Sequence, residues 1–138
     1  MSLEAALYDV LSSDTGVTAD VGGPRDPRIY PQQLPSGKDV PALVLSVPVS
    51  SAAESCDGAV EPRIATVEIA CWAAGPDEAL ALAESVRAAV RAAAGSHGGV
   101  TIQYAVLLDE REATETNERS ERLSRVARRQ TWEIAYTT

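Results

Sequence analysis

The sequence predicts an α+β domain in which two helices pack on one face of a mainly antiparallel sheet of four to five strands. Three observations favour this class. Near the middle of the chain, an alternating strand at residues 64–73 passes through Gly75 and Pro76 into an amphipathic helix. A second amphipathic helix begins the chain, and two further alternating segments end it. The 138 residues have the size of one domain, 1–138, which can bury a core of its own.

The chain begins with a predicted helix of about three turns. Its apolar residues recur at helical spacing: Leu3, Ala6, Leu7, Val10 and Leu11. Ser2 precedes them as an N-cap, and the helix is expected to end near Ser12.

A segment rich in glycine and proline, residues 13–35, follows this helix. It predicts a helical turn at residues 17–21 and a short strand at residues 28–30. Because connections this long are uncommon in compact domains, the segment is expected to wrap the surface or contact a neighbouring molecule. An extended run then begins at Pro41, and Pro48 places this strand at a sheet edge.

The central strand and helix are the most strongly patterned part of the chain. Alternate residues of the strand define a core face: Ala65, Val67, Ile69, Cys71 and Ala73. Thr66, Glu68 and Trp72 lie on the opposite face, which predicts a half-covered strand. Pro76 suits the first helical position, because its missing N–H has no partner to lose there. An alanine-rich apolar stripe follows along the helix, and Gly95 is its predicted C-cap.

Two strands and a charged segment complete the chain. After a turn at residues 96–99, the first strand carries apolar residues on one face: Val100, Ile102, Tyr104, Val106 and Leu108. Residues 109–122 contain no leucine, valine or aromatic residue, so we expect an exposed, mobile charged arm. The last strand, residues 125–137, has a core face of Val126, Trp132, Ile134 and Tyr136. Arg128 and Gln130 interrupt that face.

The charge balance argues against some partners. Twelve basic and 20 acidic residues give a net charge of −8, and Lys38 is the single lysine, so unassisted binding to a nucleic-acid backbone is not expected. No apolar run approaches the roughly 20 residues of a membrane span, and residues 2–11 lack the features of a signal peptide. The sequence therefore predicts a cytoplasmic protein without a membrane partner.

Catalytic and metal-binding patterns are weak. His97 lies between a serine and glycines, which is typical of a solvated turn. Cys56, His97 and Asp57 could supply the groups of a thiol hydrolase, but no local signature supports them, and both Cys56 and Cys71 are expected to be free thiols. Carboxylates of the charged arm could bind a divalent cation, yet interleaved arginines would repel it. No cofactor is expected, and the pattern favours a role in assembly.

Several short motifs follow one another along the chain in a particular order. They are an N-terminal Leu/Ala helix, Val21-Gly22, Arg28-Ile29-Tyr30-Pro31, Pro41-Ala42-Leu43-Val44, Asp57-Gly58, the strand from Thr66 to Trp72, Glu78-Ala79 and Ala83-Glu84-Ser85-Val86-Arg87. This order resembles the tail-completion or tail-terminator proteins of long-tailed phages and related gene transfer agents. The chain departs from that pattern in an insertion at residues 23–27 and in the length of its charged arm.

The resemblance implies a structural virion protein that catalyses nothing. Such proteins cap the head-proximal end of the tail tube, usually as a hexameric ring, and join the tail to the head. The implied partners are further copies of the chain, the major tail tube protein and a head–tail connector or stopper protein, with DNA passing through the lumen without specific binding. Localisation would be the host cytoplasm during assembly, then the virion. Two alternatives remain, another head–tail connector component and a small thiol-dependent hydrolase.

A closed ring needs two different complementary patches on each subunit. Two segments without an evident core to join, the charged arm and the loop at residues 22–37, are expected to supply them. The residues expected to bind partners are Asp109, Glu110, Arg111, Glu112, Glu115, Glu118, Arg119 and Arg122 in the arm, with Arg28 and Tyr30 near the loop.

Overall fold

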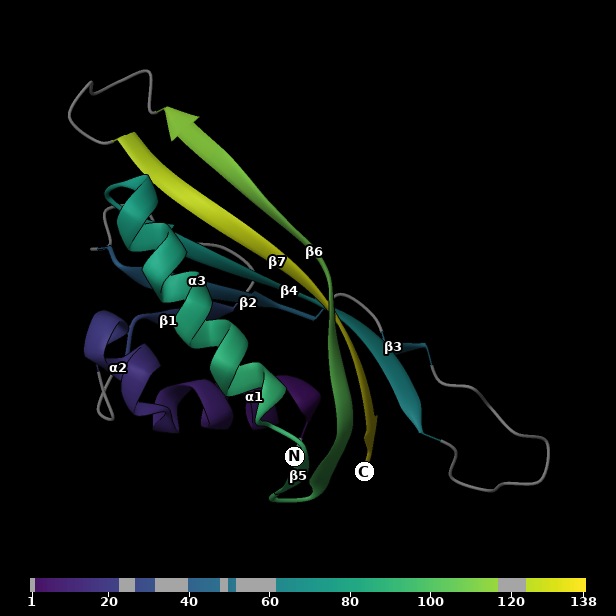
Figure 1. Cartoon of the computed structure of the whole chain (residues 1–138). Helices are drawn as coiled ribbons and strands as arrows, with labels where there is room; N and C mark the ends of the chain where they lie inside the picture. Colours follow the sequence, from purple (N-terminus) through teal and green to yellow (C-terminus); the bar gives the residue numbers. More distant parts are fainter. Residues whose placement is uncertain (1, 23–26, 32–39, 48–49, 52–61, 117–123) are drawn as a thin grey trace.

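Three helices and one curled sheet make up the described part of the chain (Figure 1). The computed structural model describes residues 2–22, 27–31, 40–47, 50–51, 62–116 and 124–138. The helices are α1 (Leu3–Ser13), α2 (Thr15–Val21) and α3 (Pro76–Arg91). Buried residues of all three helices share one core with one face of the sheet, so the predicted α+β class is confirmed.

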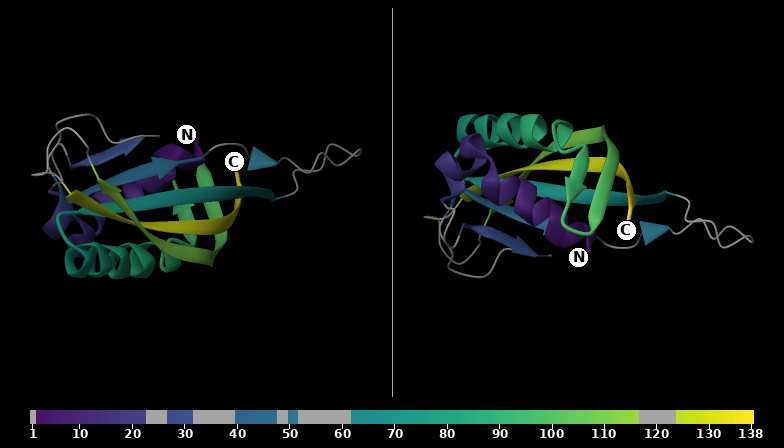
Figure 2. Two further views of the ribbon diagram at one scale, coloured as in Figure 1. Left: turned by 90° about the horizontal axis from the view of Figure 1, so that it is seen from above. Right: turned by 90° about the horizontal axis from the view of Figure 1, so that it is seen from below.

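The sheet contains seven strands among the described residues, more than the four to five predicted. They are β1 (Ile29–Pro31), β2 (Ala42–Ser46), β3 (Ser50–Ser51), β4 (Arg63–Ala73), β5 (Gly95–His97), β6 (Val100–Thr116) and β7 (Ser124–Thr137). Six of them follow the order β1-β2-β4-β7-β6-β5, and β3 pairs with β4. The pairing of β1 with β2 is parallel and every other pairing is antiparallel. Figure 2 shows how the sheet curls around the helices.

The N-terminal region has two helices where one helix and a turn were predicted. Ser2 caps α1 as expected, since its hydroxyl accepts a hydrogen bond from the amide of Ala5. Asp14 then caps α2 by accepting from the amide of Val17 at 3.0 Å. Such a short helix is marginal by itself, but this one also buries Val17 and Val21 in the core. The cap and the burial together stabilise it.

Replacement of Asp14 by alanine should destabilise the protein by about 1 kcal/mol, because one amide at the start of α2 would lose its hydrogen-bond acceptor. Urea unfolding of the two proteins measures this difference. Asp9→Ala is the matched control, since Asp9 lies on the exposed side of α1 and caps no helix. Equal unfolding midpoints for Asp14→Ala and the unmodified chain would contradict the assignment of the cap.

The central strand and helix are confirmed, with a correction at the helix end. The five predicted core-face residues of β4 are all buried, and Trp72 lies on the other face in a small cluster with Val44, Ala70 and Ala127. Helix α3 starts at Pro76 as predicted. It ends at Arg91, however, and Gly95 is not its C-cap but the first residue of β5. The predicted turn is consequently a hairpin in which Gly98 and Gly99 alone connect β5 to β6.

The alternation predicted one continuous apolar face for β6, but the strand does not keep that face. Val100 and Ile102 are buried, but the register with β7 shifts between Ile102 and Tyr104 and again between Leu107 and Asp109. Each shift is an extra residue in β6, and one extra residue moves the following side chains to the opposite face. Tyr104 and Val106 are therefore exposed by 39% and 47%, while Ala105 and Leu107 pack against the core. Leu108 is the extra residue of the second shift and is exposed by 55%.

The predicted mobile arm is wrong for residues 109–116, which continue β6. They pair with residues 124–131 of β7, so their backbone groups have partners without any need for apolar side chains. Residues 117–122 of the predicted arm lie outside the described residues. No helix in the described ranges is long and apolar enough to cross a membrane.

Candidate partner-binding surfaces

Glu110, predicted to face a partner, instead lies at the centre of a polar cluster beneath α3. Its side chain is only 10% exposed. One carboxylate oxygen accepts from Nε of Arg128 at 2.9 Å and from the guanidinium of Arg87 at 3.3 Å. The other accepts from the amide of Gln130 at 2.7 Å. Glu110 therefore connects β6 to β7 and to α3.

Gln130 extends this cluster into the core. It is fully buried, and its amide also donates to the backbone carbonyl of Ala83 in α3 at 2.9 Å. Its side-chain oxygen accepts from the indole N–H of Trp132 at 3.0 Å. The polar interruption of the apolar face of β7 is thus a satisfied network that fixes the helix on the sheet.

The surroundings of Glu110 favour its charged form. Burial by itself would raise the pKa of Glu110, but hydrogen bonds from Gln130 and Arg128 and the charges of Arg87 and Arg128 lower it below the ordinary value. Because Arg87 and Arg128 balance its negative charge, Glu110 stabilises the fold and is not a free ligand for a cation. No group of three or more His, Cys, Asp or Glu side chains suited to a metal occurs among the described residues.

Cys71, expected to be a free thiol, and His97, considered as part of a thiol hydrolase, are both described by the structure. Cys71 is a buried free thiol, and its pKa is raised by burial and by the nearby charge of Glu110. His97 is half-buried in β5 rather than solvated in a turn, and its Nε2 donates to the carbonyl of Ala93 at 2.6 Å. Cys56 and Asp57 lie outside the described residues.

Cys71 should resist alkylation in the folded protein, because a buried thiol with a raised pKa forms little accessible thiolate. In a Cys56→Ser background, we expect iodoacetamide to modify Cys71 at least about a hundredfold faster in denaturant than in buffer. Mass spectrometry of timed samples measures both rates. Equal rates would show that the thiol is accessible and would contradict the packing of β4 against α3.

Three exposed apolar side chains of β6 form a surface that we call the β6 patch: Tyr104, Val106 and Leu108. Tyr104 and Val106 lie opposite Ala135 and Glu133 of β7, on the face of the sheet that the helices leave uncovered. The hydroxyl of Tyr104 donates to Glu133 at 3.2 Å, which holds the ring across the strand. Neighbouring exposed apolar side chains of this kind are typical of an interface.

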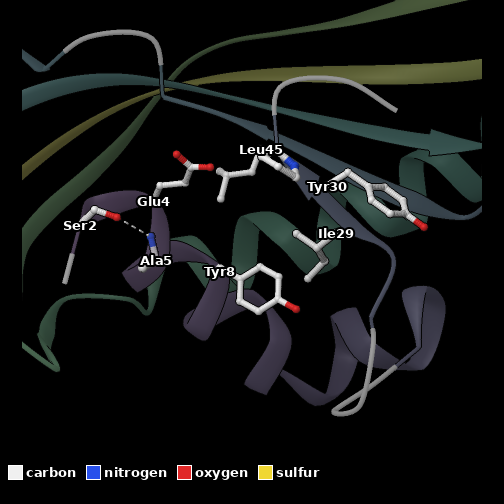
Figure 3. Close-up of a pocket in the computed structure, with 8 residues that line it drawn as sticks. Ser2, Glu4, Ala5, Tyr8, Ile29, Tyr30 and Leu45 are labelled. Carbon is white, nitrogen blue, oxygen red and sulfur yellow. Dashed lines mark hydrogen bonds between the residues drawn. The ribbon is translucent and has the colours of Figure 1, made fainter. Parts of the chain in front are cut away.

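A groove of about 470 Å³ lies at the other end of the sheet, between α1 and the edge strand β1 (Figure 3). We call it the α1–β1 groove. Its lining residues are mostly apolar: Ser2, Glu4, Ala5, Tyr8, Ile29, Tyr30, Pro31 and Leu45. Glu4 is the charged residue among them. The predicted partner residue Tyr30 belongs to this groove, whereas no pattern in the sequence indicated the contribution of α1.

Arg28, also predicted to bind a partner, makes contacts within the chain. Its Nε donates to the carbonyl of Pro41 at 2.8 Å, and its guanidinium donates to the carbonyl of Asp20 at 2.9 Å. These bonds tie the end of α2 to the start of β2. Arg28 therefore supports the position of β1, and hence of the α1–β1 groove.

The remaining predicted partner residues divide by position. Asp109 and Arg111 are exposed and form an ion pair at 2.7 Å, and Glu112 is exposed beside them in β6. Glu115 belongs to the same strand. Glu118, Arg119 and Arg122 lie outside the described residues. For all of these residues, binding of a partner stays a prediction.

Comparison with known proteins identifies the family. Residues 5–132 match the family model described as tail completion protein gp17. The chain belongs to this family. It is therefore a structural protein of a phage-type tail, as the order of its motifs indicated. No curated protein matches the chain.

A solved structure shows the same fold. It is a chain of the virion of a native gene transfer agent particle, with a TM-score of 0.68 and 19% sequence identity. The alignment covers 99% of this chain and 96% of the other. The curled sheet with its helices is thus an architecture that a virion protein of similar length also has.

Proposed function

We propose that this protein closes the head-proximal end of a tail tube as a ring of identical subunits, six by the family resemblance, and joins the tail to the head connector. The match of residues 5–132 to the tail completion family carries this proposal. The fold shared with a chain of a gene transfer agent virion supports it. The role is structural, and no catalytic step is part of it.

The geometry of the chain suits a ring. Rotational closure joins two different patches of neighbouring subunits, and the chain has two separate apolar surfaces, the β6 patch and the α1–β1 groove. The net charge of −8 suits a channel for DNA, because a negative wall does not retain a polyanion. The tail tube protein and the connector would bind the two faces of the ring.

Removal of the gene tests the proposal. Particles produced without the protein should contain DNA-filled heads and separate tails, and addition of purified protein should join them. Electron microscopy counts the joined particles before and after addition. Addition of heat-denatured protein to the same heads and tails is the control. Heads and tails that join without the protein would contradict the proposed function.

A further inference from the structure

We propose that the β6 patch of one copy of this chain inserts into the α1–β1 groove of the next copy, and that this contact repeats around the ring. The inference rests on the proposed function, since a ring of identical copies is its setting. It names the surfaces through which the copies join.

The two surfaces lie at opposite ends of one sheet. The strand order begins with β1, which lines the groove, and ends with β6 and the short β5. A subunit can therefore use both surfaces at once, for two different neighbours. Contact between two unlike patches is heterologous, and it closes into a ring when the rotation between copies permits.

The chemistry of the surfaces is complementary. The β6 patch exposes an aromatic and two aliphatic side chains to solvent. Burial of these side chains against another apolar surface would lower the free energy. The α1–β1 groove is concave and lined mainly by carbon, and its 470 Å³ is large enough for several side chains. Each surface thus has the shape and polarity that the other requires.

Side-chain insertion is favoured over pairing of strand edges. Within the described residues, β6 pairs only with β7 beyond Ile102, so its outer backbone edge is open there. Its two bulges, however, lie at the two ends of the patch, at residue 103 directly before Tyr104 and at Leu108. Bulges twist an edge away from regular ladder pairing while re-aiming side chains. The contact is therefore expected to be made by Val106 and Leu108 and not by a continuous ladder.

Charges at the two surfaces are also complementary. Arg111 follows the patch, its side chain is 80% exposed, and Asp109 contacts its Nε at 2.7 Å. Glu4 is the charged side chain of the groove. An ion pair between Arg111 of one copy and Glu4 of the next would fix how the two copies align, and would add little to the affinity of the contact.

Cysteine crosslinking in assembled particles tests the contact. In a Cys56→Ser background, the double variant Val106→Cys with Ala5→Cys should give a ladder of oligomers with a short bis-maleimide, as should Leu108→Cys with Ala5→Cys. Each single variant should give no ladder, because its partner position has no thiol. Dimers from Val106→Cys alone would show an isologous contact. That result, or double variants no more crosslinked than the singles, would overturn the proposal.

Charge exchange gives a second readout. Arg111→Glu should reduce the incorporation of the protein into joined particles at least about tenfold, and Glu4→Arg in the same chain should restore it. Arg91→Glu is the matched control, since Arg91 is exposed at the end of α3, away from both surfaces. Failure of Glu4→Arg to restore incorporation would contradict the register.

The outcomes separate this inference from the proposed function. A crosslinked ladder formed by protein that lies elsewhere in the virion would support the contact and contradict the position at the tail end. Protein at the junction of head and tail without any ladder would contradict the contact alone.

Discussion

Replacement of Trp132 by alanine should remove about 4 kcal/mol of stability, a large share of the 5–15 kcal/mol typical of a domain. Trp132 is fully buried in the main core between the sheet and the helices. Its indole N–H also satisfies the buried oxygen of Gln130. The substitution would leave a cavity and an unsatisfied acceptor together. Chemical denaturation followed by circular dichroism measures the loss.

Two further variants separate these causes. Trp132→Phe keeps most of the apolar volume and removes the hydrogen bond, so we expect a loss of about 1–3 kcal/mol. Trp72→Ala removes the same side chain from the outer face, where it packs in a smaller cluster, and should cost less than Trp132→Ala. An equal loss for the two tryptophan-to-alanine variants would contradict the position of the main core.

Glu110→Ala should destabilise the protein by about 3 kcal/mol, because it leaves Arg87, Arg128 and Gln130 without their shared acceptor. Thermal or urea unfolding measures this loss. Glu84→Ala is the matched control, since Glu84 also pairs with Arg87, at 3.9 Å, but is 63% exposed. Removal of such a surface pair should change stability by less than about 0.5 kcal/mol. Equal effects of the two substitutions would contradict the buried network.

The stabilisation by Glu110 should depend on pH. Its pKa in the folded protein is lowered, so its contribution is complete above the ordinary glutamate pKa of about 4.3 and is lost as pH falls through the folded value. The difference in unfolding free energy between the unmodified chain and Glu110→Gln should therefore shrink below about pH 4. A difference that grows in acid would show that burial, and not the arginines and Gln130, dominates at this carboxylate.

The sequence was sufficient to predict an element where its apolar residues had a clear helical or strand period and its ends carried clear signals. The strand and helix around Pro76 follow the sequence closely, because alternation, a helical stripe and a proline at the first helical position agree with one another. Helix α2 was predicted only as a turn. Its seven residues give almost no periodicity, and its stability depends on the cap by Asp14 and on burial against other elements.

The errors in β6 have a physical origin. A β-bulge reverses the faces of a strand without leaving a mark in the alternation, so Tyr104, Val106 and Leu108 were placed on the same face as the buried Val100 and Ile102. Composition also misled at residues 109–116. A lack of apolar residues argues against burial of the side chains. Pairing with β7, however, satisfies the backbone hydrogen-bonding groups of this segment without any side-chain burial.

The candidate surfaces could be predicted only in part. Tyr30 was expected to face a partner; it lines the α1–β1 groove, and its binding of a partner stays a prediction. The groove itself unites residues of α1, β1 and β2 that are far apart in the sequence, so only the fold brings them together. Likewise, the interruption of β7 by Gln130 was visible, but its partner Glu110 is 20 residues away on another strand.

Electron microscopy of particles that carry a gold-labelled copy of this protein measures its position in the virion. We expect label at the junction between the tail tube and the head, in a ring around the tail axis. Label along the tube, at the far end of the tail or on the portal inside the head would contradict it, as would particles that contain no label.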